Sequence, residues 1–234
     1  MKKKLIVSGC SFTDKHFSSP HHPDEDFTWP KWPELLAEKL GMECVNLARS
    51  GQGNEFIYTS LLDEIMSIED KSEIGLIIPA WTQTNREDYQ VRGYWHRLKA
   101  RTHGDVISWV NTSLRYYTSL QLLCERYNLP YYQFQMLNLY YDYMDGFMQN
   151  DDEINPRIYR GNKAYDTNLI FNLLNGYEHI DSTKFLGWPI AKEMGGYVMS
   201  ELILGKNYWV SPLDDHPNEI GHQKLAEAIY DRLG

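Results

Sequence analysis

Hydrophobic residues follow two different spacings that alternate along the chain. Residues 5–7 (Leu-Ile-Val) form a short continuous apolar run, which is typical of a strand buried in a parallel sheet. Between residues 54 and 67, apolar side chains instead recur every three to four positions, as on one face of a helix. On these criteria we predict strands at 4–8, 42–47, 74–80 and 130–136, and helices at 32–41, 54–67, 106–127, 196–204 and 223–233.

Strands that alternate with helices favour a mostly parallel α/β sheet covered by helices on both faces. The 234 residues, 42% of them hydrophobic, can bury one sizeable core, so we predict a single domain over 1–234. Two stretches, 86–105 and 138–190, break the alternation. Long loops of compact domains are commonly lids or binding surfaces, and we expect these two to be insertions that determine specificity.

The composition narrows the range of partners. A net charge of −9, with scattered Lys and Arg residues, disfavours a nucleic-acid partner, which needs a clustered basic face. No apolar run is long enough to span a bilayer, and the three apolar residues after Lys4 are too few for a signal peptide. Three widely spaced cysteines, without a Cys-x-x-Cys pair, favour a reducing compartment. We therefore expect a cytoplasmic protein without a membrane partner.

Two short motifs near the ends of the chain carry the candidate chemistry. Ser11 directly follows the first predicted strand, and open α/β sheets bind ligands at the carboxyl ends of their strands. A serine hydroxyl becomes a good nucleophile when a base takes its proton, and His216 is the candidate base. Taken singly, the first motif could be only a strand-to-loop turn and the second only a polar helix cap.

Three sequence blocks together resemble those of the SGNH (GDSL-type) hydrolases, in the same order and at similar spacing. Residues 9–12 (Gly-Cys-Ser-Phe) resemble the Gly-Asp-Ser-Leu block, residues 46–51 the glycine block, and residues 214–217 (Asp-Asp-His-Pro) the terminal Asp-His block. The resemblance runs from residue 5 to about residue 230, although 86–207 matches only in its alternation of elements.

This resemblance implies a flavodoxin-like three-layer α/β/α sandwich with about five strands, and a serine hydrolase that uses neither metal nor organic cofactor. By position, Ser11 would be the nucleophile and His216 the base. The backbone N–H groups of Ser11 and Gly51 would form the oxyanion hole, completed by a side-chain amide from a third block. Glycine suits position 51 because no Cβ stands between its N–H and the substrate.

The chain departs from the family pattern at three places. Cys10 replaces an aspartate that supports the turn, and Leu213 stands where many members have the triad acid. We therefore prefer Asp214, two residues before the histidine, over Asp215, whose side chain would point elsewhere in an extended segment. The third departure is in the block at residues 79–86, where the family asparagine is missing.

Two amides could take the place of that asparagine, Gln83 by position and Asn85 by residue type, and both could equally be solvated loop residues. We assign Trp81 and Asn54 to the wall of the substrate pocket, although Trp81 would also suit a packing role.

Other polar residues are weaker candidates. The imidazoles and carboxylates at 16–26 could suggest a metal site, but neighbouring side chains of a Pro-containing loop rarely converge on one ion, so we expect a solvated loop beside Ser11. His222 reads as a helix cap or a supporting residue.

We expect a serine esterase that hydrolyses small acyl esters, such as O-acetyl groups on a carbohydrate, because 17 tyrosines and seven tryptophans could stack on sugar rings. Those aromatic residues could equally fill the core. The alternatives are an acyl transferase using the same residues and a binding module without turnover; oligomeric state is not predicted.

Overall fold

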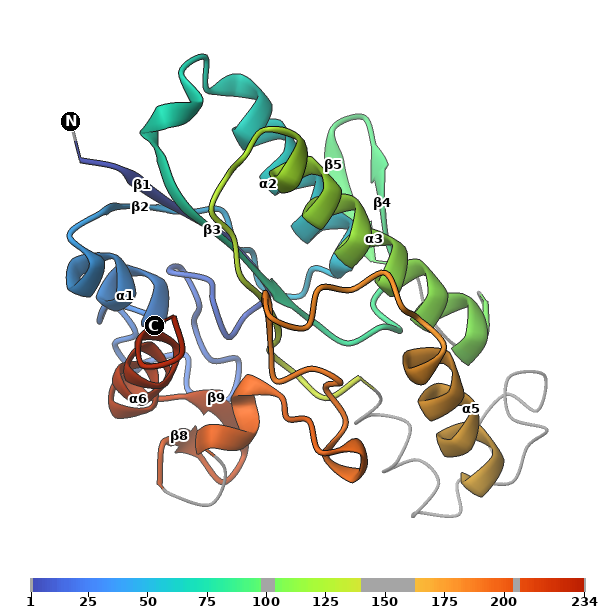
Figure 1. Ribbon diagram of the computed structural model, residues 1–234. Coiled ribbons are helices and arrows are strands. Elements are labelled where there is room, and N and C mark those ends of the chain that lie inside the picture. Colours follow the sequence, from blue (N-terminus) through green and yellow to red (C-terminus); the bar gives the residue numbers. More distant parts are fainter. Residues whose placement is uncertain (1, 98–103, 140–162, 204–206, 234) are drawn as a thin grey trace.

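The computed structural model describes residues 2–97, 104–139, 163–203 and 207–233 (Figure 1). At its centre lies a five-stranded sheet in the order β2-β1-β3-β6-β7, in which every pair of neighbours is parallel. These strands are β1 (Lys4–Ser8), β2 (Glu43–Asn46), β3 (Ile74–Trp81), β6 (Gln133–Gln135) and β7 (Phe185–Leu186). The predicted parallel α/β sheet is confirmed.

Helices cover both faces of this sheet and make a three-layer sandwich (Figure 1). One face carries α1 (Trp32–Leu40) and α6 (Glu219–Tyr230), and the other carries α2 (Asn54–Ser67), α3 (Val106–Arg126) and α5 (Lys163–Asn175). Each face has its own hydrophobic cluster.

The two central strands are apolar at successive positions because both of their faces are buried. In β3, Ile77 and Trp81 belong to the cluster under α2 and α3, while Ile78 and Ala80 belong to the cluster under α1 and α6. Side chains of a strand alternate between the two faces of the sheet, so a continuous apolar run is what a doubly covered strand requires. This is the physical basis of the strand signal in the sequence.

Several elements differ from the predicted ones. The predicted helix 196–204 is a 3-10 helix, η4 (Met199–Ile203), and the predicted strand 130–136 is shortened to β6. The closing helix α6 begins earlier than residue 223, because the Asn218 side chain accepts a hydrogen bond from the N–H of Gly221 (2.9 Å) and caps the helix. Two further 3-10 turns are η1 (Lys71–Glu73) and η3 (Lys192–Met194).

Both expected insertions contain regular structure. The stretch 86–105 carries an antiparallel hairpin of β4 (Asp88–Val91) and β5 (Tyr94–Arg97), and the stretch 138–190 carries α5 and β7. Because β7 completes the central sheet, part of the second stretch belongs to the framework. Residues 98–103 and 140–162 lie outside the described residues. A second hairpin, β8 (Trp209–Ser211) and β9 (Asp214–Pro217), precedes α6.

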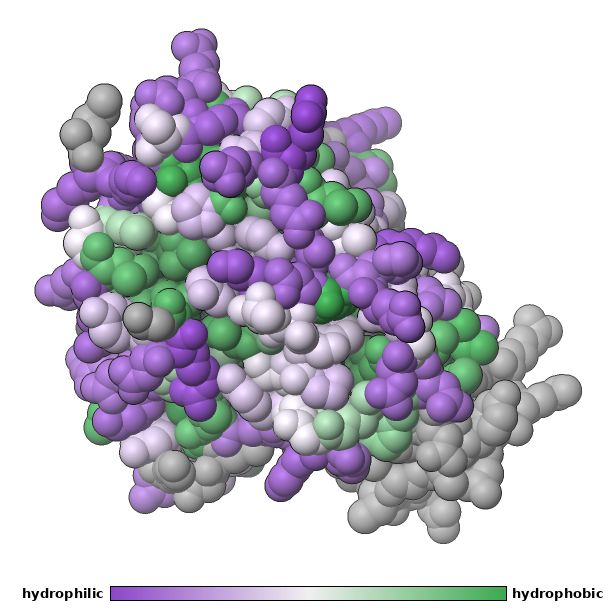
Figure 2. All heavy atoms as spheres, in the orientation of Figure 1, coloured by the Kyte–Doolittle hydropathy of each residue, from purple (hydrophilic) through white to green (hydrophobic). Residues whose placement is uncertain are grey.

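On the face shown in Figure 2, hydrophilic residues surround separate, small hydrophobic patches. Among the described residues, no helix has the length and apolar character needed to cross a membrane.

The α3 helix offers a matched test of this packing. Leu120 is fully buried against the sheet, whereas Leu122 is 56% exposed on the same helix. We predict that Leu120→Ala lowers the free energy of unfolding by about 2–5 kcal/mol, because it removes buried methyl groups and leaves a cavity. Leu122→Ala should change it by less than about 0.5 kcal/mol. Urea denaturation measures both, and equal losses would contradict the assigned faces of α3.

Candidate active site

Ser11 lies in a tight turn directly after β1. The backbone N–H groups of Thr13 and Asp14 both donate to the carbonyl of Cys10, at 2.9 and 3.0 Å, and this folds the chain back under the serine. Gly9 is required by crowding, since a Cβ there would lie 2.5 Å from the Thr13 hydroxyl oxygen. The Cys10 side chain is fully buried in the core. The turn thus directs Cys10 inward and leaves Ser11 half-buried at the carboxyl edge of the sheet.

His216 and Asp214 lie on β9, where the alternation of a strand places them on the same face. Asp214 is buried and Asp215 is exposed. Leu213 occupies the turn between β8 and β9 and is 75% exposed. The hairpin explains the unusual spacing of the motif, because residues two apart on a strand share a face, whereas Leu213 and His216 do not.

The three side chains form a continuous hydrogen-bonded chain. The Ser11 Oγ lies 2.7 Å from His216 Nε2, and His216 Nδ1 lies 2.5 Å from Asp214 Oδ1. Burial alone would raise the pKa of Asp214, but hydrogen bonds from Ser19 and from the ring and backbone N–H of His216 outweigh burial and lower it. Asp214 is therefore ionised at neutral pH. This geometry is the one that serine-dependent acyl transfer uses.

Two aromatic rings position the imidazole. Phe17 stacks on His216 with ring centroids 4.2 Å apart and an interplanar angle of 24°, and Phe12 packs at 4.9 Å in a tilted arrangement. Both phenylalanines are buried. The ring of His216 therefore has little freedom to turn away from Ser11.

The loop between the turn and α1 is exposed at the histidines and carboxylates of 16–26, as expected, except for the half-buried His22. Other residues of the same loop belong to the site. Besides Phe17, its Ser19 donates a hydrogen bond to Asp214 Oδ2, and its His22 Nε2 lies 2.7 Å from the Ser211 hydroxyl on β8. Neither Phe17 nor Ser19 was predicted as a site residue. The two phenylalanines of the loop, Phe17 and Phe27, could have indicated that part of it is buried, because such side chains are rarely left in water.

The glycine block is joined to the nucleophile turn by hydrogen bonds. Asp14 accepts from the N–H and the hydroxyl of Ser50, at 2.8 and 2.7 Å, and the Asn46 amide donates to the Thr13 carbonyl at 2.8 Å. Gly51 has a φ of 80°, which is left-handed backbone, and a Cβ on it would meet no atom within 4 Å. This conformation favours glycine at position 51.

The backbone N–H groups of Ser11 and Gly51 make no hydrogen bond with any described residue.

Asp88 holds the start of α2, since its Oδ2 accepts from the N–H of Gly53 at 2.6 Å and of Phe56 at 3.2 Å. Burial raises the pKa of Asp88 to about 6, although these two bonds act in the opposite direction. The start of α2 is therefore capped by a carboxylate from the β4 hairpin.

The two candidate amides of the third block differ in their surroundings. Gln83 is buried, and its Oε1 accepts a hydrogen bond from Arg86 Nε at 2.9 Å. This contact leaves the amide protons of Gln83 available to a ligand. Asn85 is half-buried, and its buried Oδ1 has no partner among the described residues.

Trp81 and Asn54 are not placed as expected. Trp81 is fully buried, packs on Tyr117 and donates its indole N–H to Gln133 at 3.0 Å, so it is a core residue and does not form a pocket wall. Asn54 accepts from the Thr82 N–H at 2.8 Å and donates to the Ser113 hydroxyl at 3.0 Å. Its amide joins α2, β3 and α3, and these bonds occupy it within the protein.

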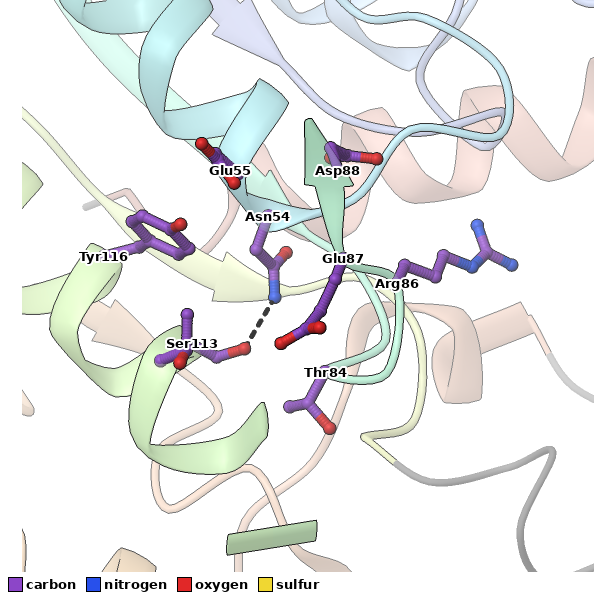
Figure 3. A pocket seen from close by; sticks show the side chains of 9 residues that line it. Asn54, Glu55, Thr84, Arg86, Glu87, Asp88, Ser113 and Tyr116 are labelled. Atoms are coloured by element: carbon purple, nitrogen blue, oxygen red, sulfur yellow. Dashed lines mark hydrogen bonds between the residues drawn. The ribbon is translucent and has the colours of Figure 1, made fainter. Parts of the chain in front are cut away.

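Asn54 does line a separate pocket of about 170 Å³. Figure 3 shows its bond to Ser113, with Glu55 on the same helix and Glu87 and Asp88 on the neighbouring segment. Ser11 and His216 are not among the residues that line this pocket. The lining holds three carboxyl groups and the guanidinium of Arg86, and burial raises the pKa of Glu55.

Among the residues considered as metal ligands, His22 has other partners. His22 contacts Ser211 and lies 3.4 Å from Glu25. Within the described part of the chain, one group of possible ligand atoms lies within 4.8 Å, that of Asp214, Asp215 and His216. Two of its members already belong to the hydrogen-bonded chain to Ser11.

Fold and site together define an α/β protein with a Ser-His-Asp arrangement at the carboxyl edge of its sheet. No protein-family model matches the sequence, and no curated protein matches it either. Among solved structures, one provisionally described as a lipolytic protein of the G-D-S-L family, from Desulfitobacterium hafniense DCB-2, is 12% identical with a TM-score of 0.51, and covers 98% of this chain and 99% of its own. TesA is 14% identical with a TM-score of 0.54, and the coverages are 99% and 98%. The chain shares the fold of these structures.

His222 is a supporting residue, and its protonation should affect stability. Burial lowers its pKa to about 3, and its neutral Nδ1 accepts from the N–H of Trp32 at 3.2 Å, which joins α6 to α1. An unfolded histidine has a pKa of about 6.5, so below that pH the unfolded chain binds a proton that the native chain does not. The stabilisation that neutral His222 contributes is therefore fully present above about pH 6.5 and is lost as the pH falls toward 3.

We predict that lowering the pH from 7 to 5 costs the wild type about 2 kcal/mol of unfolding free energy through this residue. His222→Gln should remove that loss, whereas His16→Gln, at an exposed position, should retain it. Urea denaturation at both pH values measures the difference. Equal pH dependence in wild type and His222→Gln would show that another group is responsible.

Proposed function

We propose that this protein is a serine esterase that hydrolyses small acyl esters. The observation that carries the proposal is the hydrogen-bonded chain from Ser11 through His216 to Asp214. A binding module without turnover has no need to keep the serine hydroxyl at 2.7 Å from an imidazole nitrogen that is itself oriented by a carboxylate.

The reaction would proceed in two steps. Ser11 Oγ attacks the ester carbonyl carbon while His216 Nε2 takes the hydroxyl proton. The tetrahedral intermediate then expels the alcohol, which receives that proton from His216, and leaves an acyl group on Ser11. Water, deprotonated by His216, attacks the acyl-enzyme and releases the acid and free Ser11. Throughout, Asp214 holds the imidazole in the tautomer that can accept a proton at Nε2.

The negative charge on the carbonyl oxygen would be stabilised by the N–H groups of Ser11 and Gly51 together with one side-chain amide. The two backbone donors have no partner among the described residues. They lie in the nucleophile turn and the glycine block, which the bond from Ser50 to Asp14 joins. Of the two amides, we choose Gln83, because Arg86 occupies its oxygen and its amide protons remain to be donated. Such donors act strongly because they are held in place before the charge develops.

For the substrate we propose acetyl esters, such as O-acetyl groups on a carbohydrate. Several of the aromatic residues that favour sugars are core residues, among them Trp32, Trp81 and Trp109. Tyr89 and Tyr94 remain exposed on the β4–β5 hairpin, at 40% and 71%, and flat exposed rings of this kind suit sugar faces.

The first test uses a fluorophosphonate probe and p-nitrophenyl acetate. Wild type should be labelled on Ser11 and should turn over the ester, and both activities should be lost in Ser11→Ala and His216→Ala. Asp214→Asn should lower kcat by about 10²–10⁴, because the histidine loses its orienting carboxylate. Asp215→Asn, one residue away and exposed, is the matched control and should stay within about twofold of wild type. Folded wild type that is not labelled would support the binding-module alternative.

The second test separates the two amides of the third block. Gln83→Ala should lower kcat by about 10²–10³, the usual effect of removing an oxyanion donor. Asn85→Ala should leave kcat within severalfold of wild type. Steady-state kinetics with p-nitrophenyl acetate measure both, together with circular dichroism to check folding. The reverse order of effects would assign the donor to Asn85.

A further inference from the structure

Asp214 is bonded on both of its carboxylate oxygens, from two distant parts of the chain. Oδ1 accepts from the ring of His216 at 2.5 Å and from its backbone N–H at 3.1 Å. Oδ2 accepts from the hydroxyl of Ser19, 195 residues earlier in the sequence. Ser19 is only 2% exposed and Asp214 only 4% exposed, so water does not compete freely for this contact.

Ser19 is the donor in this hydrogen bond, because an ionised carboxylate can only accept. The Ser19 oxygen accepts from the backbone N–H of His21 at 3.1 Å. A serine hydroxyl has one proton to donate, and that proton is left for the Asp214 carboxylate.

The loop that carries Ser19 is itself anchored on both sides. On the side of the β8–β9 hairpin, Phe17 stacks on His216 and His22 bonds to Ser211. On the side of α1, Phe27 packs edge-on against Phe17 at 5.6 Å, and the buried ammonium of Lys31 donates to the Phe27 carbonyl at 2.5 Å. Ser19 is therefore delivered to Asp214 by a packed segment.

We propose that Ser19 is a positioning residue of the active site, whose hydroxyl holds the Asp214 carboxylate in the rotation that aims Oδ1 at His216; this rests on the proposed esterase function. The last torsion of an aspartate side chain is broad, so the backbone alone does not determine which oxygen faces the histidine. Ser19 supplies the missing constraint through Oδ2. Its loss would also leave a buried carboxylate oxygen without a donor.

The Ser19 hydroxyl also acts on the charge of Asp214. Its hydrogen bond is one of the contacts that lower the pKa of Asp214 against the effect of burial, so it helps to keep the carboxylate ionised and able to accept from His216.

The test compares Ser19→Ala with wild type, using fluorophosphonate end-point titration to count active sites. Per titrated site, Ser19→Ala should lose about 10- to 100-fold in kcat/KM for p-nitrophenyl acetate, as expected for a hydrogen bond to a charged group. The loss should lie in kcat, with KM within about twofold. Ser18→Ala, at the exposed neighbouring position, is the matched control.

Ser19→Thr, which retains the hydroxyl, should recover most of the rate, and Ser19→Cys, with a weaker donor, should be intermediate. If Ser19→Ala folds poorly, these two variants order the rates per titrated site by donor strength. A purely structural role predicts fewer titratable sites with unchanged kcat at each, and that result would overturn the proposal while leaving the esterase intact. Wild type that is not labelled would instead overturn both.

Discussion

The contact between Ser11 and His216 is the constraint on which the rest of the structure depends, because it joins residues 205 positions apart. Ser11 is placed by β1, one strand from the edge of the sheet, and His216 by the hairpin that leads into α6. The two positions can be held to within a hydrogen bond only if α6 packs in one orientation on the sheet. His222 supports that orientation, since its ring accepts from the backbone at the start of α1.

The sheet provides the rigid base for this contact. β1 and β3 are buried on both faces, between clusters of apolar side chains that hold α1 and α6 on one side and α2 and α3 on the other. Packed interiors have low compressibility, so the carboxyl ends of these strands can hold atoms at hydrogen-bond distances. The loops at that edge then need only short local bonds, such as those of Asp14 to Ser50, to complete the site.

Several polar groups that are buried beside the site have hydrogen-bond partners. Lys31 is almost fully buried, and burial lowers the pKa of its ammonium, yet it donates to two backbone carbonyls and lies over the ring of Trp29. Ser19 and Asp14 are likewise buried and bonded. An unpaired polar group in the same places would cost stability, so these bonds allow a polar loop to pack against the imidazole. Through Phe17 and Ser19, the segment 13–31 contributes to the site together with the turn that carries Ser11.

The sequence by itself determined the alternation of β1, β2, β3 and β6 with α1, α2, α3 and α6, because periodic apolar residues are local information. It did not predict the β4–β5 and β8–β9 hairpins, which lack that signal. It also indicated Ser11, His216 and Asp214, since a serine after a strand and residues two apart on an extended segment have predictable positions. It did not reveal Ser19, Phe17 or the place of β7 in the sheet, and it assigned Trp81 to a pocket where the structure has core. Those outcomes depend on contacts between segments far apart in the chain, and only the packed tertiary structure decides which distant side chains meet.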